Sequence, residues 1–139
     1  MADRVIQELT EAQCLELIAP GGIGRICYNS RFGPAVLPVN YALRDGAVVF
    51  RTAVHGALDE DLRTGIANAD YRVAFEIDSF DLGTRQGWSV LIHGPAHHVT
   101  GAEEDAARNA GIESWAPGER ELFLRIVPSR ITGRRIGPA

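Results

Sequence analysis

Apolar and polar residues alternate along much of this chain, which is the pattern of β-strands with one buried face. The clearest example spans residues 71–78, where Tyr71, Val73, Phe75 and Ile77 alternate with Arg72, Ala74, Glu76 and Asp78. Similar apolar runs predict further strands at residues 23–29, 35–43, 47–53, 86–100 and 122–136, the last being one or two strands bent at Pro128. Asp45 and Gly46 separate two of these runs and predict a tight antiparallel hairpin.

Three short helices are expected between the strands. Residues 10–19 begin at Thr10, whose hydroxyl can cap the helix, and Gln13 occupies the capping-box position. Residues 57–66 carry leucine and isoleucine at four-residue spacing, and residues 102–110 form a charged helix. Helices this short are expected to plug or flank a sheet.

The order of these elements predicts the fold class. The first three strands follow one another through short turns, which produces an antiparallel meander and excludes a doubly wound parallel sheet. Six such strands close most economically into an antiparallel barrel, because closure removes the unpaired sheet edges. We therefore predict a mainly β protein with short helices, built as a six-stranded antiparallel barrel. The 139 residues contain no linker or repeat, so residues 1–139 are expected to form one domain.

Composition excludes several functional classes. All 14 basic residues are arginine and stand against 18 acidic residues, so the net charge of −4 argues against a nucleic-acid-binding face. No run of 18 apolar residues is present, which predicts that no helix spans a membrane. Cys14 and Cys27 form no CxxC pair, and no apolar signal-peptide core follows Met1. We expect a cytoplasmic protein with unpaired thiols.

The sequence provides little evidence for metal binding or for nucleophilic catalysis. His93, His97 and His98 share one predicted strand, but His93 and His97 would lie roughly 13 Å apart, and the adjacent pair would point in opposite directions. We therefore expect no metal site. Glu76 and Asp78 share a strand face and would form either a solvated edge or an interface.

Anion binding has a better candidate in Arg51 and Thr52. They end a predicted strand just before a turn of small residues and the helix expected near Gly56. A guanidinium, a hydroxyl and the N–H groups of a helix N-terminus can together hold a phosphate. The alternative is an arginine that pairs with a surface acid beside a threonine that favours strand structure.

Six segments together resemble the FMN-binding split-barrel family, the pyridoxamine-5′-phosphate-oxidase-like proteins. They are residues 24–26, 36–41, 48–53, 73–78, 87–94 and 131–136, in the family's order and over almost the whole chain. The chain is most similar to the branch of small proteins that includes nitroimidazole-resistance reductases. The resemblance implies a homodimer of six-stranded split barrels, with one FMN in each of two clefts between the subunits.

The resemblance also assigns candidate cofactor residues. Val39, Asn40 and Tyr41 match the strand whose backbone runs along the isoalloxazine ring. Arg51 and Thr52 match the strand end that contacts the FMN phosphate.

Other positions match the family less completely. Trp88 and Ser89 occupy the place where relatives carry an Arg-Gln pair beside the flavin, and Arg135 matches a substrate-binding arginine near the end of pyridoxamine phosphate oxidases. Relatives carry a basic residue about where Ala57 stands, and Arg63 is the candidate to replace it. Loss of one charged phosphate contact costs about 1.5–3 kcal/mol, which predicts weakened FMN binding.

The resemblance implies an FMN-dependent oxidoreductase that is reduced by NADH, NADPH or another reductant and acts on an unknown small substrate. Two alternatives remain open. One is a non-catalytic binder or carrier of FMN, a deazaflavin coenzyme or haem, with His55 as the first haem-ligand candidate. The other is a structural barrel with an empty cleft.

Overall fold

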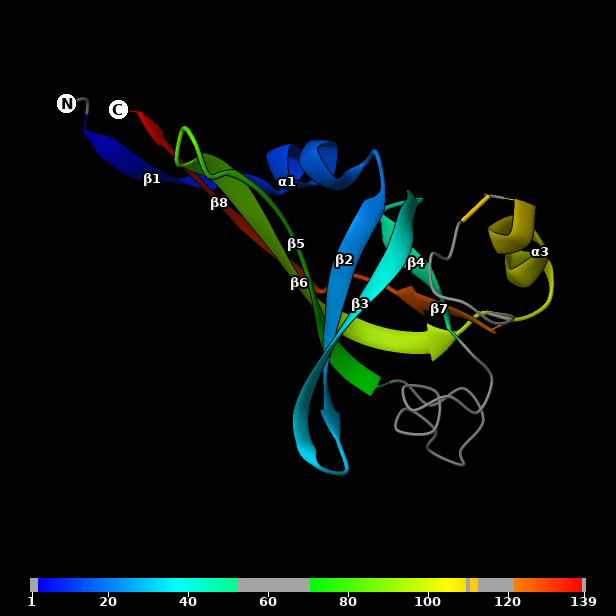
Figure 1. Cartoon of the computed structure of the whole chain (residues 1–139). Helices are drawn as coiled ribbons and strands as arrows, with labels where there is room; N and C mark the ends of the chain where they lie inside the picture. Colours follow the sequence, from blue (N-terminus) through cyan, green and yellow to red (C-terminus); the bar gives the residue numbers. More distant parts are fainter. Residues whose placement is uncertain (1–2, 53–70, 110, 113–121, 139) are drawn as a thin grey trace.

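The computed structural model describes residues 3–52, 71–109, 111–112 and 122–138. Within these residues the chain forms mainly strands (Figure 1). The strands are β1 (Arg4–Leu9), β2 (Gly22–Ser30), β3 (Gly33–Arg44), β4 (Ala47–Thr52), β5 (Tyr71–Asp81), β6 (Gln86–His98), β7 (Leu122–Ile126) and β8 (Arg130–Pro138). The helices are α1 (Glu11–Ile18) and α3 (Ala102–Asn109). The helix expected at residues 57–66 lies outside the described residues.

Six of the strands close into the predicted antiparallel barrel. Neighbouring strands follow the order β6-β5-β2-β3-β4-β7, and the pairing of β6 with β7 completes the circle. Closure leaves no long open edge around most of the barrel, which is the physical reason for expecting it from six short antiparallel strands. The prediction of a mainly β, six-stranded barrel is confirmed.

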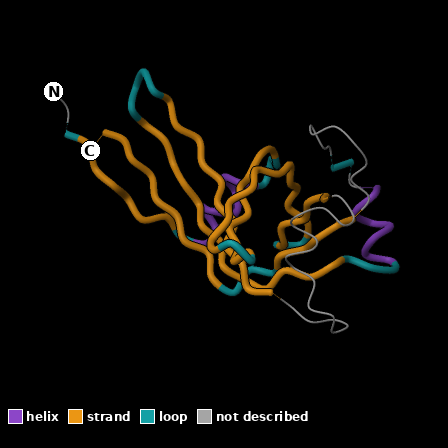
Figure 2. The backbone as a smooth tube through the Cα atoms, turned by 60° about the horizontal axis from the view of Figure 1, so that its bottom comes forward, coloured by secondary structure: helices purple, strands orange, loops and turns teal. Residues whose placement is uncertain are grey.

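The barrel is extended by a flat wing made of β1, β8 and the outer ends of β5 and β6. β6 belongs to both parts, because Ala96–His98 pairs with β7 whereas Gly87–His93 pairs with β8. Figures 1 and 2 show these strands leaving the barrel together, with the two termini at the tip of the wing. The chain changes from β7 to β8 at Pro128, as expected, and Ser129 donates a backbone hydrogen bond to the His93 carbonyl at 2.8 Å.

Strand β1 was not expected from the sequence. Its residues pair antiparallel with β8, from Arg4 opposite Pro138 to Leu9 opposite Gly133. Only Leu9 in this strand is buried, so β1 lacks the alternation of apolar and polar residues that marked the other strands. Long-range pairing with the end of the chain, rather than local pattern, decides its conformation.

Aromatic rings fill the centre of the barrel. Phe75 packs edge-on against Tyr41 at 5.5 Å and stacks on Phe50 at 6.0 Å between ring centroids. Gly24 has no side chain because the Phe75 ring occupies the space that a Cβ would need. Burying one such phenyl group contributes about 1.5–3 kcal/mol, so this cluster anchors the barrel.

Helix α1 closes one end of the core and covers one face of the wing. The expected capping box is present, since the Thr10 hydroxyl accepts from the Gln13 backbone N–H and the Gln13 side chain accepts from the Thr10 backbone N–H. The buried sulfur of Cys14 lies where a Cβ on Gly133 would come within 2.5 Å of it. The glycine therefore lets the helix lie directly against β8.

The β3 pattern was only partly correct. Asp45 and Gly46 form the expected turn, both with positive φ, as this kind of hairpin requires. The alternating residues of 35–43 share one face of the strand, but only Tyr41 among them is buried in the single chain and Leu37 is 38% exposed. The β2–β3 hairpin extends beyond the barrel (Figure 1), so its outer half has no core to cover it.

Candidate functional site

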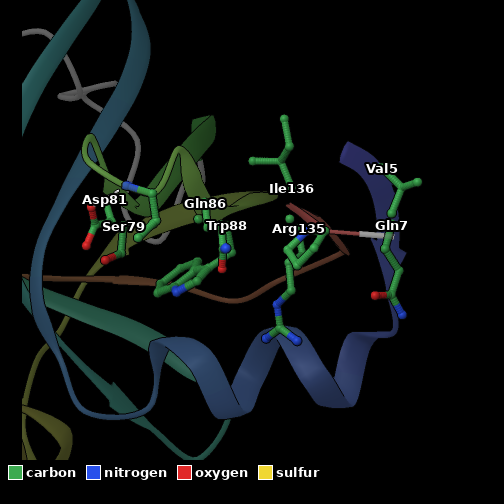
Figure 3. A pocket seen from close by; sticks show the side chains of 12 residues that line it. Val5, Gln7, Ser79, Asp81, Gln86, Trp88, Arg135 and Ile136 are labelled. Carbon is green, nitrogen blue, oxygen red and sulfur yellow. Dashed lines mark hydrogen bonds between the residues drawn. The ribbon is translucent and has the colours of Figure 1, made fainter. Parts of the chain in front are cut away.

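A pocket of about 450 Å³ lies on the α1 side of the wing (Figure 3). Trp88 on β6 and Arg135 on β8 are direct cross-strand partners, so both side chains project from the same face. Gln7 pairs with Arg135 on one side, and Ser79 pairs with Trp88 on the other. We call this site, lined by Gln7, Ser79, Gln86, Trp88 and Arg135, the wing pocket.

The chemistry of the wing pocket suits a planar, electron-rich or anionic ligand. The indole of Trp88 offers an aromatic face, and the guanidinium of Arg135 offers five donors and a positive charge. Within the described residues, the guanidinium of Arg135 makes no hydrogen bond or ion pair with another side chain or backbone group. Gln7 and Gln86 add amide donors and acceptors, which can hydrogen-bond the polar edge of a heterocycle.

Asp81 at the rim of the wing pocket has a structural role. Its carboxylate accepts hydrogen bonds from the backbone N–H groups of Gly83 and Thr84, at 2.8 and 3.0 Å. The bond from Thr84, followed by the one from Gly83, lowers the pKa of Asp81 below its usual value. The carboxylate therefore stays ionised and shapes the β5–β6 turn.

Ser89 does not share this pocket. It pairs with Asp78 on β5 and Arg134 on β8, and each of these residues is the chain neighbour of a residue that pairs with Trp88. Successive side chains in a strand point to opposite faces, so the Ser89 hydroxyl faces away from Trp88. The structure therefore separates two residues that the resemblance had placed together beside a flavin.

Arg51 and Thr52 lie at the end of β4, at the far side of the barrel. The Arg51 guanidinium donates to the Ile112 carbonyl at 3.1 Å and lies 5.4 Å from the centre of the Phe123 ring. Thr52 is buried, with 7% of its surface exposed. The side chain of Arg51 is thus half-buried and held in place by these contacts. We call this pair the strand-end site.

Strand β3 lies beside the strand-end site and presents an open edge. Tyr41 pairs with Phe50, the residue before Arg51, but residues 33–40 have no strand next to them on this side within the described residues. Val39 and Tyr41 direct their side chains into the core, whereas Asn40 points out of it. The outer half of β3 therefore offers backbone donors and acceptors to a ligand.

Tyr41 is a core residue and not a candidate general acid. Its hydroxyl donates to the Ile18 carbonyl at 2.8 Å inside the protein. Burial raises the pKa of Tyr41 to about 12. The backbone of Tyr41 lies between β2 and β4, opposite Gly22 and Phe50, so the open edge of β3 ends before this residue.

The two cysteines are unpaired, as expected. Cys14 is buried, and Cys27 is half-buried on β2 rather than fully enclosed. Burial, and after it the negative charge of a nearby glutamate, raises the pKa of both thiols. Both are therefore protonated near neutral pH and unsuited to nucleophilic chemistry.

A single chain does not bring the two candidate sites together. The end of β6 lies near the strand-end site. His98 on β6 pairs with Leu124 on β7, and the next residue of β7, Phe123, pairs with Arg51. Ten residues of β6, roughly 33 Å of extended strand, separate His98 from Trp88 in the wing pocket. The wing pocket and the strand-end site therefore lie toward opposite ends of β6 in a single chain. Arg63, Ala57 and His55 lie outside the described residues.

Sequence reasoning missed Gln7, Ser79 and Gln86. Gln7 belongs to the unexpected strand β1, so no local signal could have placed it beside Arg135. Ser79 and Gln86 lie on the β5–β6 hairpin, and their partners follow from its register. The sequence signal that could have predicted this hairpin is the segment 81–85, which contains Gly83 and separates two runs of alternating residues.

The six-stranded split barrel defines the structural class of this chain, and comparison with known proteins assigns the family. The chain belongs to the pyridoxamine 5′-phosphate oxidase family, whose model matches residues 10–135. The uncharacterized protein Rv0080 of Mycobacterium tuberculosis is 32% identical over 133 residues, which cover 96% of this chain and 87% of that protein.

Two solved structures share the fold over almost their full lengths. One is a candidate pyridoxamine 5′-phosphate oxidase from Corynebacterium glutamicum, with a TM-score of 0.77 and 28% identity, covering 100% of this chain and 98% of that one. The other is an FAD-binding protein from Mycobacterium smegmatis, with a TM-score of 0.68 and 28% identity, covering 94% of this chain and 98% of that one.

Neither described helix has the length and hydrophobicity needed to cross a lipid bilayer. Among the described residues, no three His, Cys, Asp or Glu side chains converge as a metal-binding group would.

Proposed function

We propose that this protein is a flavin-dependent oxidoreductase that binds FMN in clefts shared by two copies of the chain and acts on a small substrate. The observation that carries the proposal is the separation of the wing pocket from the strand-end site. Each has half of the chemistry that a flavin mononucleotide needs, and a single chain holds the halves apart. A second copy supplies the missing half.

The strand-end site and the β3 edge fit the phosphate and the ring edge of the cofactor. Arg51 and Thr52 offer a guanidinium and a hydroxyl for the phosphate. The edge of β3 at residues 33–39 that faces away from β2 lies next to no other described strand, so its backbone groups can exchange hydrogen bonds with the polar edge of the isoalloxazine ring. Asn40 extends this polar surface on the side facing out of the core.

The wing pocket fits the aromatic ring or a substrate lying against it. Trp88 would stack on a planar ring, and Arg135 would hold a negative charge beside that ring. When bound, FMN supplies the redox chemistry by accepting electrons from NADH or NADPH and passing them to the substrate. The protein's own residues bind, orient and shield these partners. The buried Tyr41 hydroxyl takes no part in proton transfer.

The relationship to the FAD-binding protein of Mycobacterium smegmatis supports a flavin as the ligand class. That protein binds the dinucleotide, so the experiment must compare FMN with FAD. Deazaflavin and haem are the alternatives within the same barrel.

The decisive experiment is an absorption spectrum of the freshly purified protein, repeated after adding FMN or FAD and removing the excess. Retained flavin bands support the proposal, and consumption of NADH or NADPH with an added electron acceptor then tests the oxidoreductase activity. A protein that rejects both flavins but retains haem or a deazaflavin would overturn the FMN assignment.

The mass of the protein in solution tests the shared cleft separately. A dimer at micromolar concentration is expected with bound FMN. A strict monomer that still binds FMN tightly would show that one chain completes the site alone, against the proposed sharing.

A further inference from the structure

Strand β1 forms the free edge of the wing. It stands first in the strand order, and β8 is its only neighbour among the described strands (Figure 2). An edge strand presents backbone N–H and C=O groups that no neighbouring strand satisfies. Ile6, near the middle of β1, is 63% exposed and Val5 is 45% exposed, so the edge also carries apolar surface.

The backbone groups that point to the free edge follow from Pro138. Arg4 pairs with Pro138, which has no N–H group, so these two residues cannot exchange the two bonds of a hydrogen-bonded pair. Hydrogen-bonded and non-hydrogen-bonded pairs alternate along an antiparallel ladder. Arg4, Ile6 and Glu8 are therefore in non-hydrogen-bonded pairs with β8, and their N–H and C=O groups point away from it. These three residues offer a full set of backbone partners to a further strand.

The side chains of the same three residues are self-complementary. Arg4 and Glu8 lie two residues before and two residues after Ile6, on one face of the strand. A second β1 that runs antiparallel, with the two copies of Ile6 opposite each other, places each Arg4 opposite Glu8 of the partner subunit. A shift of two residues in either direction would oppose Ile6 to a charged residue instead. Charges of one sign would repel a second copy from this edge, whereas this symmetric pair of opposite charges favours one register.

The other charges near the edge are compatible with this pairing. Arg134 on β8 is the cross-strand partner of Glu8, and neither side chain makes an ion pair or hydrogen bond with the described residues. Glu8 would thus lie between two arginines, one of its own chain and one of the partner subunit. The Arg4 guanidinium donates one exposed hydrogen bond, to the Thr84 carbonyl at 3.3 Å, and has further N–H donors. Asp3, just before the strand, would face no charged residue of the partner strand.

We propose that two copies of this chain associate edge to edge through β1, in an antiparallel pairing centred on Ile6 that continues the wing sheet from one copy into the other. This contact goes beyond the proposed function, because it requires neither a flavin nor the strand-end site. Copies that are already joined through a shared cleft would assemble further through their β1 edges. The paired strands are only six residues long, so the association should be weak and should grow with protein concentration.

A cysteine at position 6 tests the register. Opposite residues of a hydrogen-bonded pair have Cα atoms about 5.5 Å apart, which is within the range of a disulfide bond. Ile6→Cys should therefore give a covalent dimer under mild oxidation, measured on a non-reducing gel. Val5→Cys is the matched control, because two copies of residue 5 would lie roughly 8 Å apart, too far for a disulfide bond. Its yield should be about fivefold lower, and both variants retain the two native cysteines.

Proline at the same position distinguishes backbone pairing from contact between side chains. Ile6→Pro removes an N–H group that points to the free edge and leaves the hydrogen bonds between β1 and β8 in place. Ile6→Thr keeps the N–H group and the preference for strand structure, so it is the matched control. In analytical ultracentrifugation, Ile6→Pro should lose the concentration-dependent assembly, whereas Ile6→Thr should weaken it less than about threefold. Circular dichroism checks that both variants are folded.

Charge reversal tests the pairing of Arg4 with Glu8. Arg4→Glu opposes two glutamates and should raise the dissociation constant of the β1 contact about tenfold at low salt, with a smaller effect at high salt. The double variant Arg4→Glu/Glu8→Arg restores opposite charges and should recover part of this loss, because Arg134 beside position 8 repels the new arginine. No recovery at all would contradict the register.

The outcomes separate this inference from the proposed function. Equal disulfide yields at positions 5 and 6, or equal assembly of Ile6→Pro and Ile6→Thr, would overturn the β1 pairing and leave the shared cleft intact. A parent protein that assembles while Ile6→Pro is a strict monomer would support the β1 pairing and overturn the shared cleft.

Discussion

Trp88 and Arg135 are direct cross-strand partners on β6 and β8, with both side chains in one pocket beneath α1. They lie 47 residues apart in the chain (135 − 88), yet the register places an aromatic face beside a guanidinium that makes no hydrogen bond or ion pair with the described residues. Such a pair recognises flat rings that carry negative charge or polar edges.

Replacing Trp88 by alanine should weaken flavin binding about tenfold. The reason is the loss of one aromatic stacking contact, which contributes on the order of 0.5–1.5 kcal/mol beyond buried area. Quenching of flavin fluorescence during titration measures the affinity. Leu82→Ala, on a 91% exposed residue of the β5–β6 turn, is the control and should change nothing. Unchanged affinity in Trp88→Ala would place the ring elsewhere.

Arg51→Ala should lower the affinity for FMN by roughly ten- to a hundred-fold, because a charged hydrogen bond to the phosphate is worth about 1.5–3 kcal/mol. Riboflavin, which lacks the phosphate, distinguishes this effect from damage to the contacts that Arg51 makes with Ile112 and Phe123. We expect riboflavin to bind the variant and the parent protein equally. Equal losses for both ligands would make Arg51 a structural residue only.

Gly133→Ala should destabilise the protein by about 1–3 kcal/mol, because the added methyl group meets the sulfur of Cys14 and forces α1 away from β8. Gly137→Ala is the matched control on the same strand, since nothing lies within 4 Å of its added Cβ. Urea unfolding gives both values. Adding Cys14→Ala to Gly133→Ala should recover part of the loss, and strictly additive effects would contradict the contact.

Stability should fall as the pH rises from about 4.5 to about 7, because of Glu76. Burial, and after it the neighbouring Asp78, raises the pKa of Glu76 to about 7 from an ordinary 4.5, against the opposing effect of Arg25. On β6, His93 lies two residues from Leu91, the cross-strand partner of Glu76. In this pH range the folded protein holds a proton that the unfolded chain has released, so raising the pH removes stability, and above 7 the loss is complete.

Glu76→Gln removes this titration and should flatten the curve between pH 4.5 and 7. The measurement is the free energy of unfolding in urea at a series of pH values and one fixed protein concentration, since association also contributes to stability. A variant with the same slope as the parent protein would assign the pH dependence to another group.

The local pattern of apolar and polar residues was sufficient to predict most of the strands and α1. Alternation at 71–78 led to β5, the Asp45-Gly46 turn led to the β3–β4 hairpin, and Thr10 with Gln13 marked the start of α1. These features depend on neighbours a few residues apart, which a sequence displays directly. The closure of six antiparallel strands followed because open edges are costly. The pattern at residues 35–43 could not show where the core of the barrel ends, so only the structure reveals that the outer half of β3 extends beyond it.

The candidate site was less accessible to sequence reasoning. The resemblance to split-barrel proteins identified Trp88 and Arg135, but only the register of β6 against β8 shows that they adjoin and that Ser89 faces the other way. Gln7 joins them through β1, an edge strand with a single buried residue and no local signal.

The sequence by itself determined most of the strands, the barrel, the family and the residue types available for binding, because these depend on local periodicity and on ordered motifs. Only the tertiary structure decided which side chains share a face and how far the strand-end site lies from the wing pocket. The physical reason is that strand register is set by contacts between residues far apart in the chain. A shift of one residue would turn every side chain of a strand to the opposite face.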